Sequence, residues 1–235
     1  MAERDRPLYA VLIDADNIPA RYASAILKEI TSFGEPALRR VYGDWSSSRL
    51  NNWAKVVHEL GLVAHQETAN TTGKNASDIG LVIDAMDILH SRRFDGFVLV
   101  SSDSDFTSLA NRVREQGLDV IGVGEAKTPE SLRNVCNRFI LLENIVEDAS
   151  PAAQGKTTGK QDPKTAVPLI VRAMEKINSD DDWYTLGQLG QYITRDTPDF
   201  DPRTYGKKKL SDLITGLSRF ETKKIGTQLH VRRVD

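Results

Sequence analysis

Apolar and polar residues alternate along the first two thirds of the chain in blocks typical of strands and helices in turn. Short β-branched runs predict strands that are buried on both faces, and amphipathic stretches that end at glycine predict helices between them. The expected strands are residues 8–13, 37–45, 62–68, 94–102 and 118–124. The expected helices are residues 19–34, 47–61, 77–91, 105–117 and 128–139, with a last apolar segment at 140–145. This order predicts an α/β fold with a mainly parallel sheet and helices on both faces.

The helix expected at residues 77–91 is apolar around most of its circumference, so we expect it to be largely buried. It carries Asp84 and Asp87, which lie one turn apart. A buried acid without a partner is expensive. Asp84 is therefore expected either to have an internal hydrogen bond or ion pair, or to orient residues that bind a metal.

The pattern changes after residue 146. Residues 147–164 are rich in Ala, Gly, Pro, Thr, Gln and Lys and have no apolar periodicity, which predicts a flexible linker. The segments after it predict three helices and then a strand, a glycine turn and a strand, at residues 165–178, 183–196, 206–220 and 222–234. This is the pattern of a winged helix. We expect one domain at residues 7–146 and a small winged-helix-like domain at residues 165–235.

Acidic residues follow two of the expected strands. Asp14 and Asp16 come after the first, and Asp103 and Asp105 come after the fourth. Ligands of open α/β sheets bind at the carboxyl ends of strands, and acids gathered there repel one another unless a cation or protons intervene. Mg²⁺ takes oxygen ligands and promotes phosphodiester hydrolysis. With Asp78 near the start of a helix, these acids favour a metal site over the alternative of solvated acidic turns.

Polar residues near these acids are candidate substrate ligands. Asn17 is suited to orienting a water or a phosphate without adding charge. Ser101 and Ser102 are suited to capping the next helix or to binding a phosphate at its N-terminus. Lys74 lies in a polar loop and is suited to neutralising a phosphate, although a lone loop lysine is ordinarily solvated. Cys136 is the only cysteine, so no intramolecular disulfide is expected.

Composition and charge narrow the class of protein. The 235 residues are 40% hydrophobic and 27% charged, which is ordinary for a soluble globular protein. No apolar stretch is long enough to cross a membrane, and no signal peptide is recognisable, so we expect a cytoplasmic protein without a membrane partner. Residues 1–149 hold 16 basic and 22 acidic side chains, whereas residues 150–235 hold 15 and 11. The basic second part favours an anionic partner.

Three segments carry a family resemblance: "YAVLIDADNIP", "KNASDIGLVIDAMD" and "FVLVSSDSDFTSLANRVREQGLDVIGVG". Over residues 7–146 the chain resembles the NYN domain, a branch of the PIN-like metal-dependent ribonucleases with a Rossmann-like parallel sheet. The resemblance implies that Asp14, Asp78, Asp103 and Asp105 bind Mg²⁺ or Mn²⁺ in RNA hydrolysis, and that Asn17 matches the family's asparagine. Asp16 is the less usual element and is expected to face outward.

Two other functions stay open from the sequence. The Asp-x-Asp pattern at residues 14–16 also resembles the haloacid-dehalogenase phosphatases, in which the first Asp is a nucleophile. Their later Ser or Thr, Lys and distal acidic pair are only partly imitated here, by residues 103–105. The other alternative is a non-catalytic RNA-binding adaptor in which the acidic site is a vestige.

The second domain has its own resemblance. The run from Pro198 to Leu213, P-x-F-D-x-R-x-Y-G-x-x-K-L-x-x-L, is similar to the LOTUS domain, also called OST-HTH. The resemblance implies RNA binding and, for some members, a protein partner. Basic residues around a turn suit a single-stranded RNA, with the tyrosine placed to stack on a base; these residues are Arg203, Tyr205, Lys207, Lys208 and Lys209. Whether the chain forms a homodimer is left open.

Overall fold

The computed structural model describes residues 5–66, 76–146, 160–177 and 182–234. The chain divides into two compact units, Met1–Pro151 and Ala152–Asp235. No helix in the described ranges is long and apolar enough to span a membrane.

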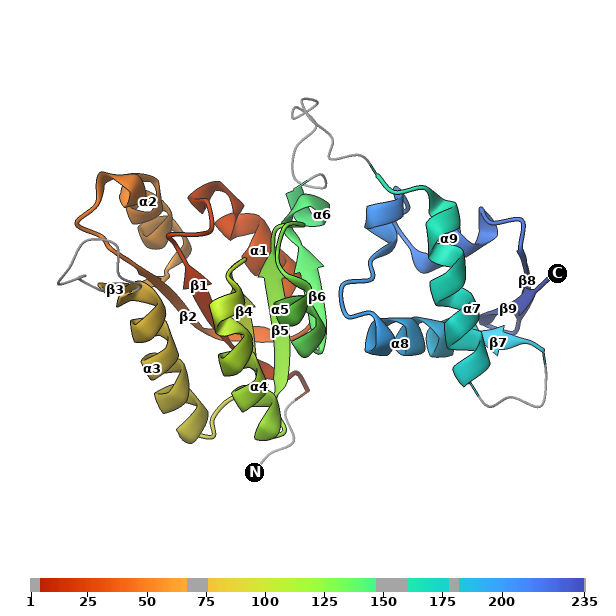
Figure 1. The fold of residues 1–235 in the computed structure, drawn as a ribbon, viewed down its shortest axis with the longest axis horizontal. Coiled ribbons are helices and arrows are strands. Elements are labelled where there is room, and N and C mark those ends of the chain that lie inside the picture. Colours follow the sequence, from red (N-terminus) through yellow and green to blue (C-terminus); the bar gives the residue numbers. More distant parts are fainter. Residues whose placement is uncertain (1–4, 67–75, 147–159, 178–181, 235) are drawn as a thin grey trace. The chain divides into compact units, whose positions relative to one another are not determined.

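A parallel sheet forms the centre of the first unit, as predicted, but it has six strands where five were expected (Figure 1). Its strand order is β3-β2-β1-β4-β5-β6, so β1 and β4 are neighbours in the middle. The strands are β1 (Leu8–Asp14), β2 (Glu35–Gly43), β3 (Val63–Gln66), β4 (Gly96–Val100), β5 (Asp119–Gly124) and β6 (Arg138–Leu141). Strand β6 was not predicted, because its residues were assigned to the end of a helix and to the apolar segment after it.

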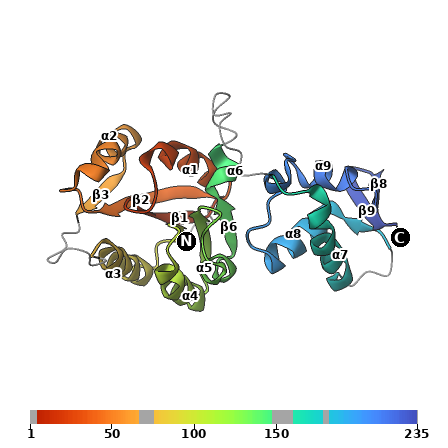
Figure 2. The same ribbon diagram turned by 45° about the horizontal axis from the view of Figure 1, so that its top comes forward.

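Helices cover both faces of this sheet (Figure 2). One face carries α1 (Ala23–Ile30), α2 (Asn51–Leu60) and α6 (Leu142–Val146). The other face carries α3 (Ala76–His90), α4 (Thr107–Glu115) and α5 (Glu130–Val135). Three of the predicted helices begin as a short 3-10 turn, at Ala20–Tyr22, Ser48–Leu50 and Ser104–Phe106.

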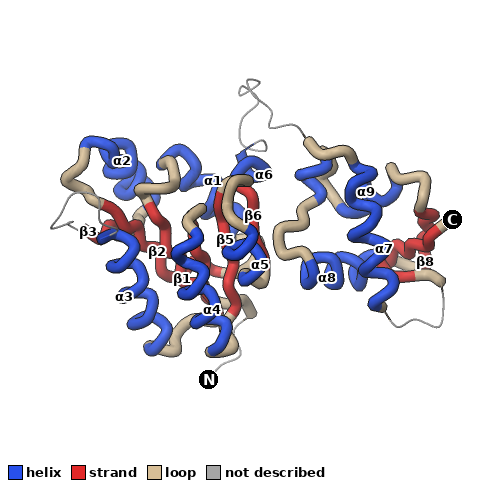
Figure 3. The backbone as a smooth tube through the Cα atoms, in the orientation of Figure 1, coloured by secondary structure: helices blue, strands red, loops and turns tan. Residues whose placement is uncertain are grey.

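Strand β1 shows why the apolar runs are nearly continuous. Val11 and Ile13 pack in the core under α1 and α2, whereas Ala10 and Leu12 pack in the core under α3 and α4. All four side chains are fully buried. A parallel strand between two helical layers must be apolar on both sides, and Figure 3 shows this strand layer between the helices.

Helix α3 is less buried than its composition predicted. Leu81 and Ala85 face the sheet and are buried, but Ile79 and Ile83 are 60% and 59% exposed. The helix contacts β1 and β2 of the sheet. An apolar residue on every side of a helix gives no periodic signal for the side that will face the solvent, so the prediction of a largely buried helix was wrong.

Asp84 joins α3 to β2. Its carboxylate accepts hydrogen bonds from the Arg40 guanidinium and the Tyr42 hydroxyl, and it forms an ion pair with Arg40. Tyr42 is fully buried, and burial together with the bond to Asp84 raises the pKa of its hydroxyl. Asp84 therefore has the internal partners that a half-buried acid requires, whereas Asp87 is exposed.

The second unit contains the three predicted helices and the terminal hairpin. The helices are α7 (Val167–Lys176), α8 (Leu186–Asp196) and α9 (Leu210–Thr215). An antiparallel sheet of order β7-β9-β8 packs with them, formed by β7 (Tyr184–Thr185), β8 (Phe220–Ile225) and β9 (Gln228–Arg233). Strand β7 was predicted as part of a helix. Thr185 instead caps α8 in a capping box with Gln188, so the helix begins at Leu186, three residues later than predicted.

The expected linker reaches into the second unit. Residues 147–159 lie outside the described part of the chain, but the amide of Gln161 donates a hydrogen bond to the carbonyl of Thr204 (3.0 Å). Asp162 caps the 3-10 turn Pro163–Ala166. Residues 160–164 therefore belong structurally with the second unit.

The Asp84 cluster gives a test of the packing of α3 on the sheet. We expect Asp84→Ala to lower the free energy of unfolding by about 1–3 kcal/mol, because it leaves the buried Tyr42 hydroxyl without an acceptor. Urea unfolding of the full chain measures the change. Asp87→Ala, one turn along the same helix, is the matched control and should change stability by less than about 0.5 kcal/mol. Equal losses in the two variants would contradict a specific role for Asp84.

Candidate metal centre and adjoining groove

The carboxylate of Asp14 lies at the carboxyl end of β1 and is held by four hydrogen bonds. One oxygen accepts from the Ser101 hydroxyl (2.8 Å) and from the side-chain amide of Asn17 (2.6 Å). The other accepts from the backbone amides of Asp16 (3.1 Å) and Asn17 (3.2 Å). The Asp14 side chain is only 2% exposed. Its orientation is therefore fixed by the two loops that follow β1 and β4.

Burial and hydrogen bonding act in opposite directions on this group. Burial raises the pKa of Asp14, and the hydrogen bonds from Asn17 and Ser101 lower it. Asn17 was predicted to orient a water or a phosphate. Its side-chain amide donates to Asp14 and so helps to orient that carboxylate. The role in orienting a water or a phosphate stays a prediction.

Ser101 connects Asp14 with the second acidic turn. Its hydroxyl oxygen also accepts a hydrogen bond from the backbone amide of Asp103 (3.1 Å). Asp103 in turn caps the 3-10 turn that leads into α4, accepting from the amide of Asp105 (2.9 Å). Asp103 is half-buried and Asp105 is exposed. The capping role considered for Ser101 thus belongs to Asp103, and Ser101 holds the two acidic turns together.

Asp78, in the first turn of α3, interacts electrostatically with all the other acids. Its pKa is raised to about 6, first by burial and then by the negative charges of Asp14, Asp103, Asp16 and Asp105. The structure therefore brings the four predicted acids and Asp16 to one edge of the sheet. Asp16 is exposed, as expected.

The chemistry of this set fits a hydrated divalent cation. Among the residues that the structure describes, no three His, Cys, Asp or Glu side chains form a ready-made ligand cluster. Mg²⁺ does not require one, because it retains several waters and is usually held by one or two carboxylates together with substrate phosphates. A donor set made only of oxygen suits Mg²⁺ or Mn²⁺. A bound cation would also relieve the repulsion between Asp78 and the neighbouring carboxylates.

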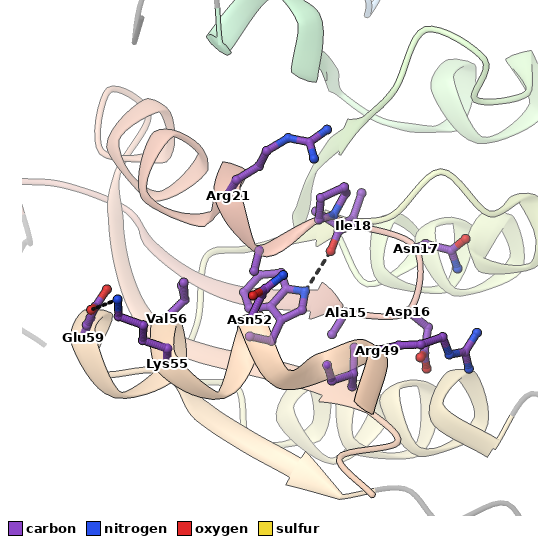
Figure 4. A pocket seen from close by; sticks show the side chains of 14 residues that line it. Ala15, Asp16, Asn17, Ile18, Arg21, Arg49, Asn52, Lys55, Val56 and Glu59 are labelled. Atoms are coloured by element: carbon purple, nitrogen blue, oxygen red, sulfur yellow. Dashed lines mark hydrogen bonds and ion pairs between the residues drawn. The ribbon is translucent and has the colours of Figure 1, made fainter. Parts of the chain in front are cut away.

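A groove of about 520 Å³ adjoins the acidic edge (Figure 4). Asp16 and Asn17 form the wall that it shares with the acids. Trp53 lies at its floor and donates a hydrogen bond from Nε1 to the carbonyl of Ile18 (2.8 Å). Its basic side chains are Arg21, Arg49 and Lys55. Sequence analysis missed this groove because its residues come from two separate segments and form no motif.

Two further candidates lie away from Asp14 or outside the described residues. Ser102 is half-buried, and its hydroxyl accepts a hydrogen bond from the backbone amide of Glu125 (2.9 Å) after β5. Lys74 lies outside the described residues. The RNA-binding roles expected for both stay predictions.

The second unit corrects one prediction about RNA contacts. Tyr205 is only 8% exposed and packs against Phe200, with 5.8 Å between ring centroids. Its ring is therefore part of the core and is not placed to stack on a base. Arg203 forms an ion pair with the buried Asp201 (2.7 Å). The remaining predicted contacts lie together at one turn, where Lys207 is half-buried and Lys208 and Lys209 are exposed.

An aromatic site that the sequence analysis missed lies beside the hairpin. The Lys223 ammonium lies 3.8 Å from the centroid of the Trp183 ring, and the Arg232 guanidinium lies 4.9 Å from it. Arg232 also pairs with Glu221, its cross-strand neighbour. The available signal was the alternation of charged residues along the two hairpin strands, which places Lys223 and Arg232 on one face.

Comparison with known proteins gives two family matches. The NYN domain matches residues 9–143, and the OST-HTH/LOTUS domain matches residues 160–231. A crystal structure of a protein of unknown function from Vibrio parahaemolyticus has a similar fold, with a TM-score of 0.50 and 18% identity over 59% of this chain and 94% of that chain. A solution structure of an uncharacterised protein from Nitrosomonas europaea is 35% identical over 36% of this chain and 85% of that chain, with a TM-score of 0.29. No curated protein matches this chain.

The crowding of acids predicts a measurable titration. In the metal-free chain at low salt, carboxyl NMR should give Asp78 a pKa of about 6. Asp14→Asn should lower that pKa toward the ordinary value, because it removes the neighbouring charge with the largest effect. Asp87→Asn, on the same helix but away from the cluster, is the control. A pKa of Asp78 that does not move in Asp14→Asn would show that the two carboxylates do not interact.

Proposed function

Because the chain belongs to the NYN domain family, we propose that it is a divalent-metal-dependent ribonuclease whose C-terminal OST-HTH/LOTUS domain binds RNA. NYN domains are nucleases, and LOTUS domains bind RNA. The observation that carries the proposal is the convergence of acids at the carboxyl ends of β1 and β4. Together with burial, their charges raise the pKa of Asp78. The proposed cofactor is Mg²⁺ or Mn²⁺.

We assign two of the acids to the cation itself and two to the waters around it. A bound divalent cation would polarise a phosphoryl oxygen and lower the pKa of an attacking water. Asp14 and Asp103 would hold it, because their carboxylates are tied to the ends of the central strands. Asp78 and Asp105 would accept hydrogen bonds from waters around it. Ser101 and Asn17 would keep Asp14 in place, so that little reorganisation is needed when substrate arrives.

The phosphatase alternative is disfavoured by the family match, because the NYN domain covers residues 9–143. A basic second unit also has no evident task in the hydrolysis of a small phosphate ester. A non-catalytic RNA-binding adaptor is the remaining alternative, and it differs from the ribonuclease in lacking metal-dependent cleavage.

Asp14→Asn tests the catalytic role of the acidic site. We expect it to abolish cleavage of labelled RNA under Mg²⁺ or Mn²⁺ while the chain still folds and binds RNA, because the amide keeps the shape of the side chain but removes its charge. Stability should fall by about 1–3 kcal/mol, since two of the four donors to Asp14 lose their acceptor. Gel-based cleavage assays and circular dichroism measure the two effects. Asp87→Asn should cleave like the wild type.

Two results would contradict the ribonuclease. One is a wild-type chain that cleaves no single-stranded or structured RNA with either ion, and the other is Asp14→Asn with undiminished activity. Calorimetry with Mn²⁺ adds an independent measurement, since the adaptor alternative predicts no binding that depends on Asp103.

Two surfaces of the second unit are available for RNA. The exposed Lys208 and Lys209 extend from the turn before α9 and can contact phosphates. Trp183 offers a ring flanked by the cations of Lys223 and Arg232, a combination suited to base stacking beside phosphate contacts. We propose that both contact a single-stranded RNA. A protein partner for this domain and a homodimer stay predictions.

Replacing Lys207, Lys208 and Lys209 together by Ala tests the first surface. In the full chain carrying Asp14→Asn, we expect weaker RNA binding and a log–log salt slope reduced by about 0.7 for each lost phosphate contact. Fluorescence anisotropy over a range of salt concentrations measures both.

Trp183→Ala provides the contrast, because loss of stacking should weaken binding with little change in the salt slope. If the triple variant keeps both its affinity and its slope, the lysines are solvated surface or contact a protein instead.

A further inference from the structure

The groove beside the acids has an apolar floor and a polar rim. Its floor includes Ile18, Leu50 and Trp53, which are all buried. Arg49 and Asn52 are exposed at its rim (Figure 4). Its volume of about 520 Å³ lies within the range of small-molecule sites, about 300–1,000 Å³. A flat apolar group attached to a charged one would match this arrangement.

The groove lining carries three basic side chains, Arg21, Arg49 and Lys55, against two acidic ones, Asp16 and Glu59, so basic groups are in excess by one. Lys55 pairs with Glu59 at 3.8 Å, so these two groove residues largely neutralise each other. Arg21 and Arg49 form no ion pair with any carboxylate in the described ranges of the chain. The Arg21 guanidinium lies 4.5 Å from the centroid of the Tyr22 ring and donates to its hydroxyl (2.7 Å). Guanidinium groups match the geometry of phosphate oxygens.

The groove and the acids share one rigid wall. The backbone amides of Asp16 and Asn17 donate to Asp14, and the same two residues line the groove. On the groove side, the Trp53 indole anchors the same loop through the carbonyl of Ile18. A ligand in the groove therefore lies next to the acids, with a fixed boundary between them.

We propose that this groove binds one unpaired nucleotide of a single-stranded RNA, next to the phosphodiester that is cut. Its base lies on the apolar floor, and its phosphate contacts Arg49 and Arg21. The proposal rests on the proposed ribonuclease function and adds a substrate requirement to it. A base that enters the groove cannot remain paired, so the chain selects unpaired RNA at this position.

Blocking the groove tests the proposal. Asn52→Trp places a bulky side chain at the exposed rim, and Asn51→Trp places the same side chain on the neighbouring exposed residue, which does not line the groove. The substrate is a labelled single-stranded oligouridylate, and the enzyme is the full chain. We expect Asn52→Trp to raise KM at least about tenfold, because the base can no longer enter the groove. A tenfold change is the size of effect that loss of one charged hydrogen bond produces. Asn51→Trp should leave KM unchanged.

The charge contacts have their own variant pair. Arg49→Ala should raise KM about tenfold with a smaller effect on kcat, since one phosphate contact is lost. Arg112→Ala removes an exposed arginine that pairs with Glu115 on α4 and should have no effect. Equal KM values for Asn52→Trp and Asn51→Trp in an active enzyme would contradict nucleotide binding in the groove but not the proposed ribonuclease activity.

Photo-crosslinking tests the groove even without activity. In the metal-free full chain carrying Asp14→Asn, 4-thiouridine in the same oligonucleotide should crosslink to residues 15–21 or 49–59, and Asn52→Trp should abolish these crosslinks. Crosslinks confined to residues 160–235 would overturn the proposal. Groove crosslinks in a chain that never cleaves RNA would support the groove and overturn the ribonuclease.

Discussion

The buried carboxylate of Asp14 is the constraint on which the rest of the first unit depends. A carboxylate that is 2% exposed is expensive unless donors replace the water it has lost. Those donors come from the loop after β1 and from Ser101 after β4. They meet only because β1 and β4 pair in register, with Ile13 beside Val100. The central strand pairing and the site are therefore parts of the same arrangement.

Charge is separated over a short distance at this edge of the sheet. On one side of the Asp16–Asn17 wall, burial and then the charges of the neighbouring acids raise the pKa of Asp78 to about 6. On the other side, Arg21 and Arg49 border an apolar floor. A nucleic acid needs both environments, because its phosphates are anionic and its bases are flat and largely apolar. The excess of acids in residues 1–149 conceals this local basic surface, since net charge does not record where charges lie.

Features that follow from local pattern could be predicted from the sequence, and features that depend on tertiary packing could not. Strands β1 to β5 and the acids after β1 and β4 were predictable, because burial on both faces produces apolar runs such as residues 8–13. The exposed side of α3 was not, since apolar residues surround that helix. Tyr205 stands among basic residues in the sequence, but its ring packs against Phe200. The groove joins residues 15–21 to residues 49–59, and no spacing rule links them.

If one chain makes two contacts with the same RNA, each contact needs less affinity of its own. If the groove holds one nucleotide and the second unit holds another part of the same strand, the second contact forms at a high effective concentration once the first has formed. Neither contact then needs high affinity alone. A groove with two rim arginines and one lysine already paired to Glu59 is consistent with a weak, position-specific contact. The exposed lysines and Trp183 of the second unit suit a contact that tolerates many sequences, because phosphates and base faces are common to all of them.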